Sequence, residues 1–197
     1  MEPESYLLAQ ARNNAWANYR LLRACASLPQ PELEAPRTGF FPSLLATLNH
    51  ILVVDWYYVD ALEGGTLGLA AFIDEVPCKT ASDLCREQES VDRRLIRLCE
   101  GLDEVALGAT VRLIRRDGDR FERCDRVLLH LFEHQIHHRG QAHAMLSGTS
   151  VAPPQLDEFF LDQDAGTRCG DLEALGGTAL GWSEAELWGG WSKPDAG

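Results

Sequence analysis

Two histidines, His134 and His138, lie four residues apart in a segment that shows a helical pattern of apolar residues. Residues at this spacing lie one above the other on a helix, with Cβ atoms about 5–6 Å apart. Two imidazoles so placed can bind one metal ion, because a metal–nitrogen bond is about 2.1 Å long. Histidine pairs at this spacing also occur on ordinary helix surfaces, so the pair alone is a weak indication.

The neighbouring residues strengthen the prediction of a metal site. Leu131, Gln141 and Met145 share the helical face of His134 and His138. We expect that face to point into the protein, where an imidazole without a partner is costly. A shared divalent transition-metal ion would remove that cost.

A third ligand has to come from another part of the chain, and His50 is the only histidine outside the segment from 125 to 146. We therefore predict that His50, His134 and His138 bind the ion. His130, one turn before His134, is the competing ligand. His137 and His143 are expected on other faces of the helix.

Four helices are predicted to position these residues. Apolar residues recur at spacings of three and four over residues 4–28, 40–63, 82–102 and 125–146. Ser82 and Asp125 are the expected N-caps of the last two, and residues 64–80 form a connection. Alternating residues from Thr110 to Arg123 surround Asp117-Gly118, which predicts a short β-hairpin with a two-residue turn.

Composition excludes several classes of partner. The net charge of −12 disfavours nucleic acids and anionic membranes, both of which need a basic surface. No apolar run approaches the roughly 20 residues of a membrane span, and the first residues lack the features of a signal peptide. The six cysteines are scattered without a C-x-x-C pair, so we expect reduced thiols and a cytoplasmic protein.

The last part of the chain differs from the rest because it combines many glycines with Trp182, Trp188 and Trp191. We predict a bundle domain over residues 1–163 and a Gly/Trp-rich C-terminal extension over residues 164–197. Large aromatic side chains favour docking of this extension on the bundle or on a neighbouring subunit, as in a homodimer, and the alternative is a partly mobile end.

Two motifs carry a resemblance to a known family, and the first of them has two parts. Asn49-His50, Asp55-Trp56-Tyr57-Tyr58 and His134-x-x-His137-His138-Arg139-Gly140-Gln141 resemble the DinB/YfiT-like superfamily, over about residues 5–160. The resemblance implies an all-α four-helix bundle with a long crossover. It also implies a zinc or nickel site at His50, His134 and His138. The family often has a histidine at the position of His130 without using it as a ligand.

Three neutral ligands leave a coordination position for water or a substrate, and a bound ion can lower the pKa of water or of a thiol. Relatives in the superfamily include S-transferases that use low-molecular-weight thiols, and a mycothiol-dependent isomerase. The expected function is therefore a metal-dependent thiol S-transferase or hydrolase that acts on a small molecule, with a small thiol as cosubstrate. The alternatives are a non-catalytic metal- or ligand-binding stress protein and a structural bundle with incidental metal affinity.

The sequence does not identify a catalytic residue. Asp55, Tyr58 and Glu133 are candidates for a supporting or acid–base role, and each has an ordinary structural explanation. Arg139 either contacts an anionic substrate or pairs with a neighbouring acid.

Overall fold

The computed structural model describes residues 3–176 and divides the chain into two units, Met1–Pro154 and Gln155–Gly197. The elements follow the order α1 (Pro3–Ala26), α2 (Gln30–Glu34), α3 (Leu44–Leu62), η1 (Gly68–Phe72), α4 (Ala81–Glu100), α5 (Glu104–Gly108), β1 (Thr110–Leu113), β2 (Arg120–Arg123), α6 (Cys124–Leu146), η2 (Asp162–Asp164) and α7 (Ala165–Gly176). The predicted all-α fold with one short hairpin is confirmed.

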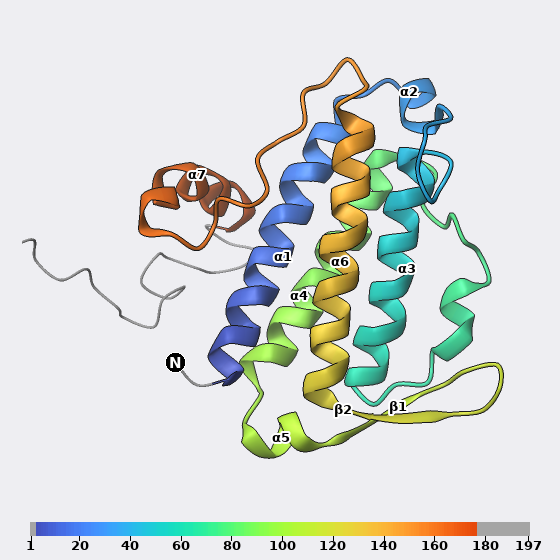
Figure 1. Ribbon diagram of the computed structural model, residues 1–197, viewed down its shortest axis with the longest axis vertical. Coiled ribbons are helices and arrows are strands. Elements are labelled where there is room, and N and C mark those ends of the chain that lie inside the picture. The colour runs from blue at the N-terminus through green and yellow to red at the C-terminus, as the bar shows by residue number, and fades with distance from the viewer. Residues whose placement is uncertain (1–2, 177–197) are drawn as a thin grey trace, which may run out of the picture. The chain divides into compact units, whose positions relative to one another are not determined.

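The long helices α1, α3, α4 and α6 form a four-helix bundle (Figure 1). Helix α1 packs against α4 and α6, and α3 packs against the same two helices. Each helix turns its apolar face inward, which removes large side chains from water. Among the fully buried ones are Trp16 of α1, Leu52 of α3, Leu95 of α4 and Leu128 of α6.

Helices α3 and α4 run in the same direction, so the chain must return along the bundle between them (Figure 1). Residues 63–80 make this crossover and include η1. The side chain of Asn49 fixes its end, because its amide donates to the Cys78 carbonyl and accepts from the Cys78 amide, both at 2.9 Å. The long crossover implied by the family resemblance is therefore present.

The hairpin differs from the prediction in its turn. Leu113 pairs with Arg120, so the connection spans residues 114–119 instead of a two-residue turn at Asp117-Gly118. The Tyr57 hydroxyl donates to the Ile114 carbonyl at 3.0 Å, which draws the chain towards the bundle directly after β1. This contact competes with the short local turn.

Several predicted helix boundaries were wrong by a few residues. Helix α3 begins at Leu44 instead of residue 40, because the Ser43 hydroxyl caps it by accepting from the Ala46 amide at 3.1 Å. Thr80, not Ser82, caps α4. Helix α6 begins directly after β2 with no side-chain cap, and Asp125 instead pairs with Arg123 at 2.7 Å.

In the second unit, Arg168 of α7 is buried and donates to the carbonyl of Leu161 at 2.9 Å. The three tryptophans of the predicted extension lie outside the described residues, as does most of the segment from 164 to 197. Among the described helices, none combines the length and the apolar character that a membrane crossing requires.

Candidate metal centre

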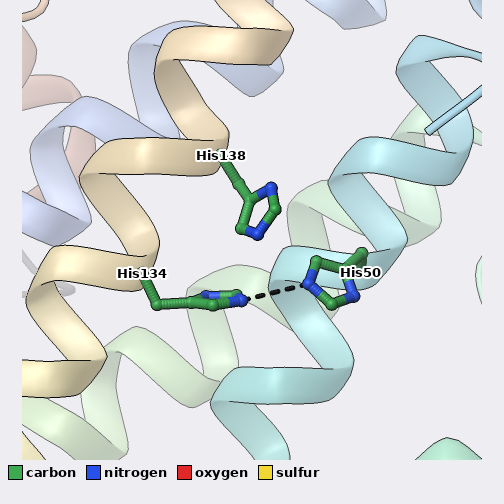
Figure 2. A group of neighbouring side chains, drawn as sticks. All are labelled: His50, His134 and His138. Atoms are coloured by element: carbon green, nitrogen blue, oxygen red, sulfur yellow. Dashed lines mark hydrogen bonds between the residues drawn. The ribbon is translucent and has the colours of Figure 1, made fainter. Parts of the chain in front are cut away.

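The three predicted ligands come together between α3 and α6. Helix α6 carries His134 and His138, and α3 supplies His50 from the facing side; Figure 2 shows the three rings converging. One ring nitrogen from each lies within 4.8 Å of the others. The closest contact joins Nε2 of His50 and Nε2 of His134 at 3.0 Å.

The remaining histidines lie outside this group. His130 is exposed, and its ring packs against Tyr58 with a centroid distance of 5.2 Å. His137 is also exposed, and His143 lies 2.9 Å from the Pro154 carbonyl through Nε2. Within residues 3–176, the structure therefore does not bring the competing ligand His130 into the group.

All three imidazoles of the group are neutral at pH 7. Burial, followed by the proximity of His138, lowers the pKa of His50 to about 4. Burial and the neighbouring histidines lower the pKa of His134 to about 3. Burial also lowers the pKa of His138, although its hydrogen bond to Gln141 acts in the opposite direction. Neutral imidazoles offer the lone pairs that a metal ion requires.

The hydrogen bonds around the group fit metal binding. Two nitrogens that each lie about 2.1 Å from one ion are about 3.0–3.4 Å apart, and the contact between His50 and His134 falls in this range. Nδ1 of His138 bonds to Oε1 of Gln141 at 2.9 Å, which leaves Nε2 free. A ligating histidine usually holds its second nitrogen in this way. The three histidines could therefore hold a divalent metal ion.

His134 lacks such support. Its Nδ1 atom is buried and has no hydrogen-bond partner among the described residues. A buried ring nitrogen without a partner is unfavourable. Burial and the neighbouring histidines also keep His134 neutral, so its Nε2 atom can offer a lone pair to a metal ion.

Two phenylalanines cover the group, and the sequence pattern did not indicate this. The ring of Phe41 lies 4.3 Å from that of His50 and 5.7 Å from that of His138, and Phe40 lies 6.5 Å from His138. Both were predicted to lie inside a helix, but they precede α3. An aromatic pair just before a helix that carries a candidate ligand is the signal that could have pointed to them.

Asp55, predicted as a possible supporting group, is buried in the core with partners from α4 and α6. Its Oδ2 accepts from the side-chain amides of Gln88, at 2.7 Å, and of Gln135. Burial, followed by the nearby Asp92, raises the pKa of Asp55 to about 8. Asp55 is therefore largely protonated at neutral pH, which does not suit a general base.

Arg139 belongs to the same buried network. Its guanidinium donates to Oδ1 of Asn18 and Oε1 of Gln135, both at 3.1 Å, and to Asn14. Asn14 and Asn18 in turn donate to Asp92 of α4. The structure thus favours a core ionic role for Arg139 over contact with an anionic substrate.

The other two acid–base candidates also lie away from the histidine nitrogens. Glu133 is exposed. Tyr58 is buried, and its hydroxyl accepts from Arg115 at 3.0 Å. Among the described residues, no side chain is positioned as an evident general base beside the group.

Comparison with known proteins agrees with this geometry. The model of the DinB family matches residues 4–168. A search of curated proteins finds no significant match. The matched region contains the bundle and all three histidines, and it spans most of the 197 residues. The chain belongs to the DinB family.

Proposed function

We propose that His50, His134 and His138 bind one zinc or nickel ion, and that the protein transfers a small thiol to an electrophilic small molecule. The observation that supports this most is the ligand set: three neutral imidazoles, joined by no fourth protein ligand from residues 3–176. Structural zinc sites are typically closed by four protein ligands, often cysteines. When bound, an ion held by three neutral ligands lowers the pKa of a thiol or of water and so supplies a nucleophile at neutral pH.

The residues of the chain would have distinct tasks. Gln141 orients His138 through the hydrogen bond to Nδ1. Phe40 and Phe41 pack beside His50 and His138 and present apolar surface there, which reduces competition by bulk water. Because the histidines are already neutral, binding an ion near pH 7 releases no proton from them.

The deciding assay follows thiol consumption against a panel of electrophiles. Metal-loaded protein, chelated protein and the His134→Ala variant are compared, with His143→Ala as the control because His143 lies on the same helix but outside the group and contacts the Pro154 carbonyl instead. We expect turnover only with metal-loaded wild-type protein and the control. Equal rates in all samples would reduce the site to a binding role.

The same assay distinguishes the two reactions. Turnover that requires metal but proceeds without a thiol would indicate a hydrolase. Elemental analysis of protein prepared without a histidine tag identifies the metal, since a tag can introduce nickel during purification.

A further inference from the structure

A pocket of about 310 Å³ lies next to the histidine group, where the hairpin meets the start of α6. Leu113 and Val127 give it apolar walls, and Tyr58, Arg115 and His130 supply polar groups. His130 is one helical turn before His134, and the two ring centroids are 6.5 Å apart. One turn of a helix rises about 5.4 Å, so a small organic molecule can span the distance between the pocket and the histidines.

Arg115 is the unusual residue of this pocket. Its guanidinium donates to the Tyr58 hydroxyl at 3.0 Å and lies 5.0 Å from the centre of the Tyr57 ring. Both partners are neutral groups. Within residues 3–176, Arg115 forms no ion pair with a carboxylate. Its side chain is half-buried, so its position is defined by these contacts.

The other charges of the pocket are compensated. Arg120 pairs with Asp117, and Arg126 pairs with Glu122 at 3.1 Å. The two carboxylates thus contact Arg120 and Arg126, and Asp117, which does not line the pocket, acts on Arg115 only from a longer distance, so Arg115 has no carboxylate contact of its own among the described residues. The positive charge of Arg115 contrasts with the net charge of −12 of the whole chain. A single unpaired guanidinium suits a group with one negative charge.

We propose that this pocket binds the carboxylate group of a small organic molecule, with Arg115 as its ionic partner. The planar guanidinium can donate two parallel hydrogen bonds to a carboxylate, and the aliphatic walls accommodate the adjoining carbon atoms. That this molecule is the substrate of the neighbouring histidine site rests on the proposed function. In that case the substrate extends from Arg115 past His130 toward the histidine group.

The test measures binding of benzoate by isothermal titration calorimetry to the full-length protein. Benzamide serves as the uncharged analogue and inorganic phosphate as the competing type of anion. Each is titrated into wild type, Arg115→Gln and Arg116→Gln; the last removes the same charge from an exposed neighbouring residue that does not line the pocket. We expect benzoate to bind more tightly than benzamide and phosphate. Arg115→Gln should weaken benzoate binding about tenfold or more, and Arg116→Gln less than twofold.

Three results would overturn the proposal: equal affinities for benzoate and benzamide, equal losses in the two variants, or tighter binding of phosphate than of benzoate. Circular dichroism checks the fold of each variant. If Arg115→Gln does not fold, Arg115→Lys replaces it in the titration, because lysine keeps the positive charge but lacks the planar pair of donors of arginine. An unchanged benzoate affinity in Arg115→Lys would then contradict the assigned contact.

Repeating the titration with His134→Ala separates this pocket from the metal site. Benzoate binding that persists in His134→Ala and still depends on Arg115 supports the pocket, whatever the thiol assay gives. Binding that disappears in His134→Ala would mean that the carboxylate binds at the histidine group, and the pocket assignment would be wrong.

Discussion

Two neighbouring faces of α6 carry polar residues that differ in their hydrogen-bond partners. His134 and His138 point to the histidine group, whereas Gln135 and Arg139, each one residue further along, point into the core. One residue rotates the direction of a side chain by about 100° around a helix. The core residues have donors and acceptors from α1, α3 and α4, with only Oδ1 of Asp55 left without a partner among the described atoms of this core network, whereas the histidines face one another and include the unpartnered Nδ1 of His134.

The core cluster is held together mainly by an arginine, carboxyl groups and side-chain amides from several helices, whereas the histidine group directs ring nitrogens toward a common point. In the core network, Arg139 supplies a positive charge near Asp55 and Asp92, and side-chain amides bridge the rest. In the histidine group, His50 and His138 lower the pKa of His134, and His138 lowers the pKa of His50. Stability should therefore depend on the first cluster, and metal binding on the second.

The largest effect is expected from breaking the core network with Arg139→Met. This change leaves the buried Asp92 carboxylate without its positive partner, which should reduce the free energy of unfolding by about 3–5 kcal/mol. Urea denaturation measures the change. The control is Arg97→Met, because Arg97 is exposed on α4.

The metal content of folded Arg139→Met protein should stay at the wild-type ratio, because none of the three histidines bonds to Arg139 among the described contacts. Loss of metal from a variant that is still folded would show that the two faces of α6 are coupled. It would contradict the separate roles of the core network in stability and of the histidine group in metal binding.

Metal removal should have the next largest effect. An ion that binds only the folded state adds about 2.7 kcal/mol when its free concentration is 100 times the Kd. Chelation should therefore lower the melting temperature of wild-type protein and leave that of His134→Ala unchanged. Identical melting curves for chelated and metal-loaded wild type, with loading verified, would contradict this link between α3 and α6.

Two further alanine variants test the ligand assignment by elemental analysis. His50→Ala should release most of the metal, because His50 is the only ligand of the group on α3. His130→Ala should retain it, since its ring packs against Tyr58 outside the group. The reverse pattern would replace His50 by His130 as the third ligand.

The two regions should also respond to pH in opposite directions. Because the pKa of Asp55 is about 8 in the folded protein and 3.8 ordinarily, the folded state binds the extra proton between these values. The free energy of unfolding should thus fall as pH rises through this range, by at most about 1.4 kcal/mol per pH unit. In Asp55→Asn this slope should become shallower, whereas the exposed Glu133→Gln should keep it.

In metal-free protein the histidines act with the opposite sign. Unfolded histidines gain protons near pH 6.5, but folded His50 and His134 stay neutral down to about pH 4 and 3. The unfolded state therefore binds more protons in this range, and stability should fall as pH decreases from about 6.5. His134→Ala should reduce the loss of unfolding free energy at acid pH, as measured by urea titrations at several pH values. An unchanged loss would show that His134 does not cause it.

The smallest effect concerns the orientation of one ligand. Gln141→Ala removes the hydrogen bond to Nδ1 of His138 and should weaken metal binding about tenfold, roughly 1.4 kcal/mol. A competition assay with a chelating dye measures the affinity. The matched control is Glu133→Ala, an exposed position on the same helix. Equal affinities in the two variants would show that His138 needs no support from Gln141.

The sequence by itself was sufficient for the four long helices and for the three histidines as candidate ligands, and the family resemblance implied the arrangement of the helices as a bundle. The helices and the histidine pair both depend on local periodicity: apolar stripes define the helices, and a spacing of four places His134 and His138 on one face. His50 followed because the chain offers no other histidine outside α6. The family motifs agree with the same choice.

Only the tertiary structure decided which polar residues belong to the histidine group and which to the core. Asp55 and Arg139 stand in the same motifs as the histidines, but their partners Gln88, Asn14 and Asn18 come from α1 and α4. The cover by Phe41 and the uncompensated charge of Arg115 likewise depend on contacts between distant segments. The physical reason is that helical spacing determines which residues share a face, whereas hydrogen bonding and burial depend on which other helix packs against that face.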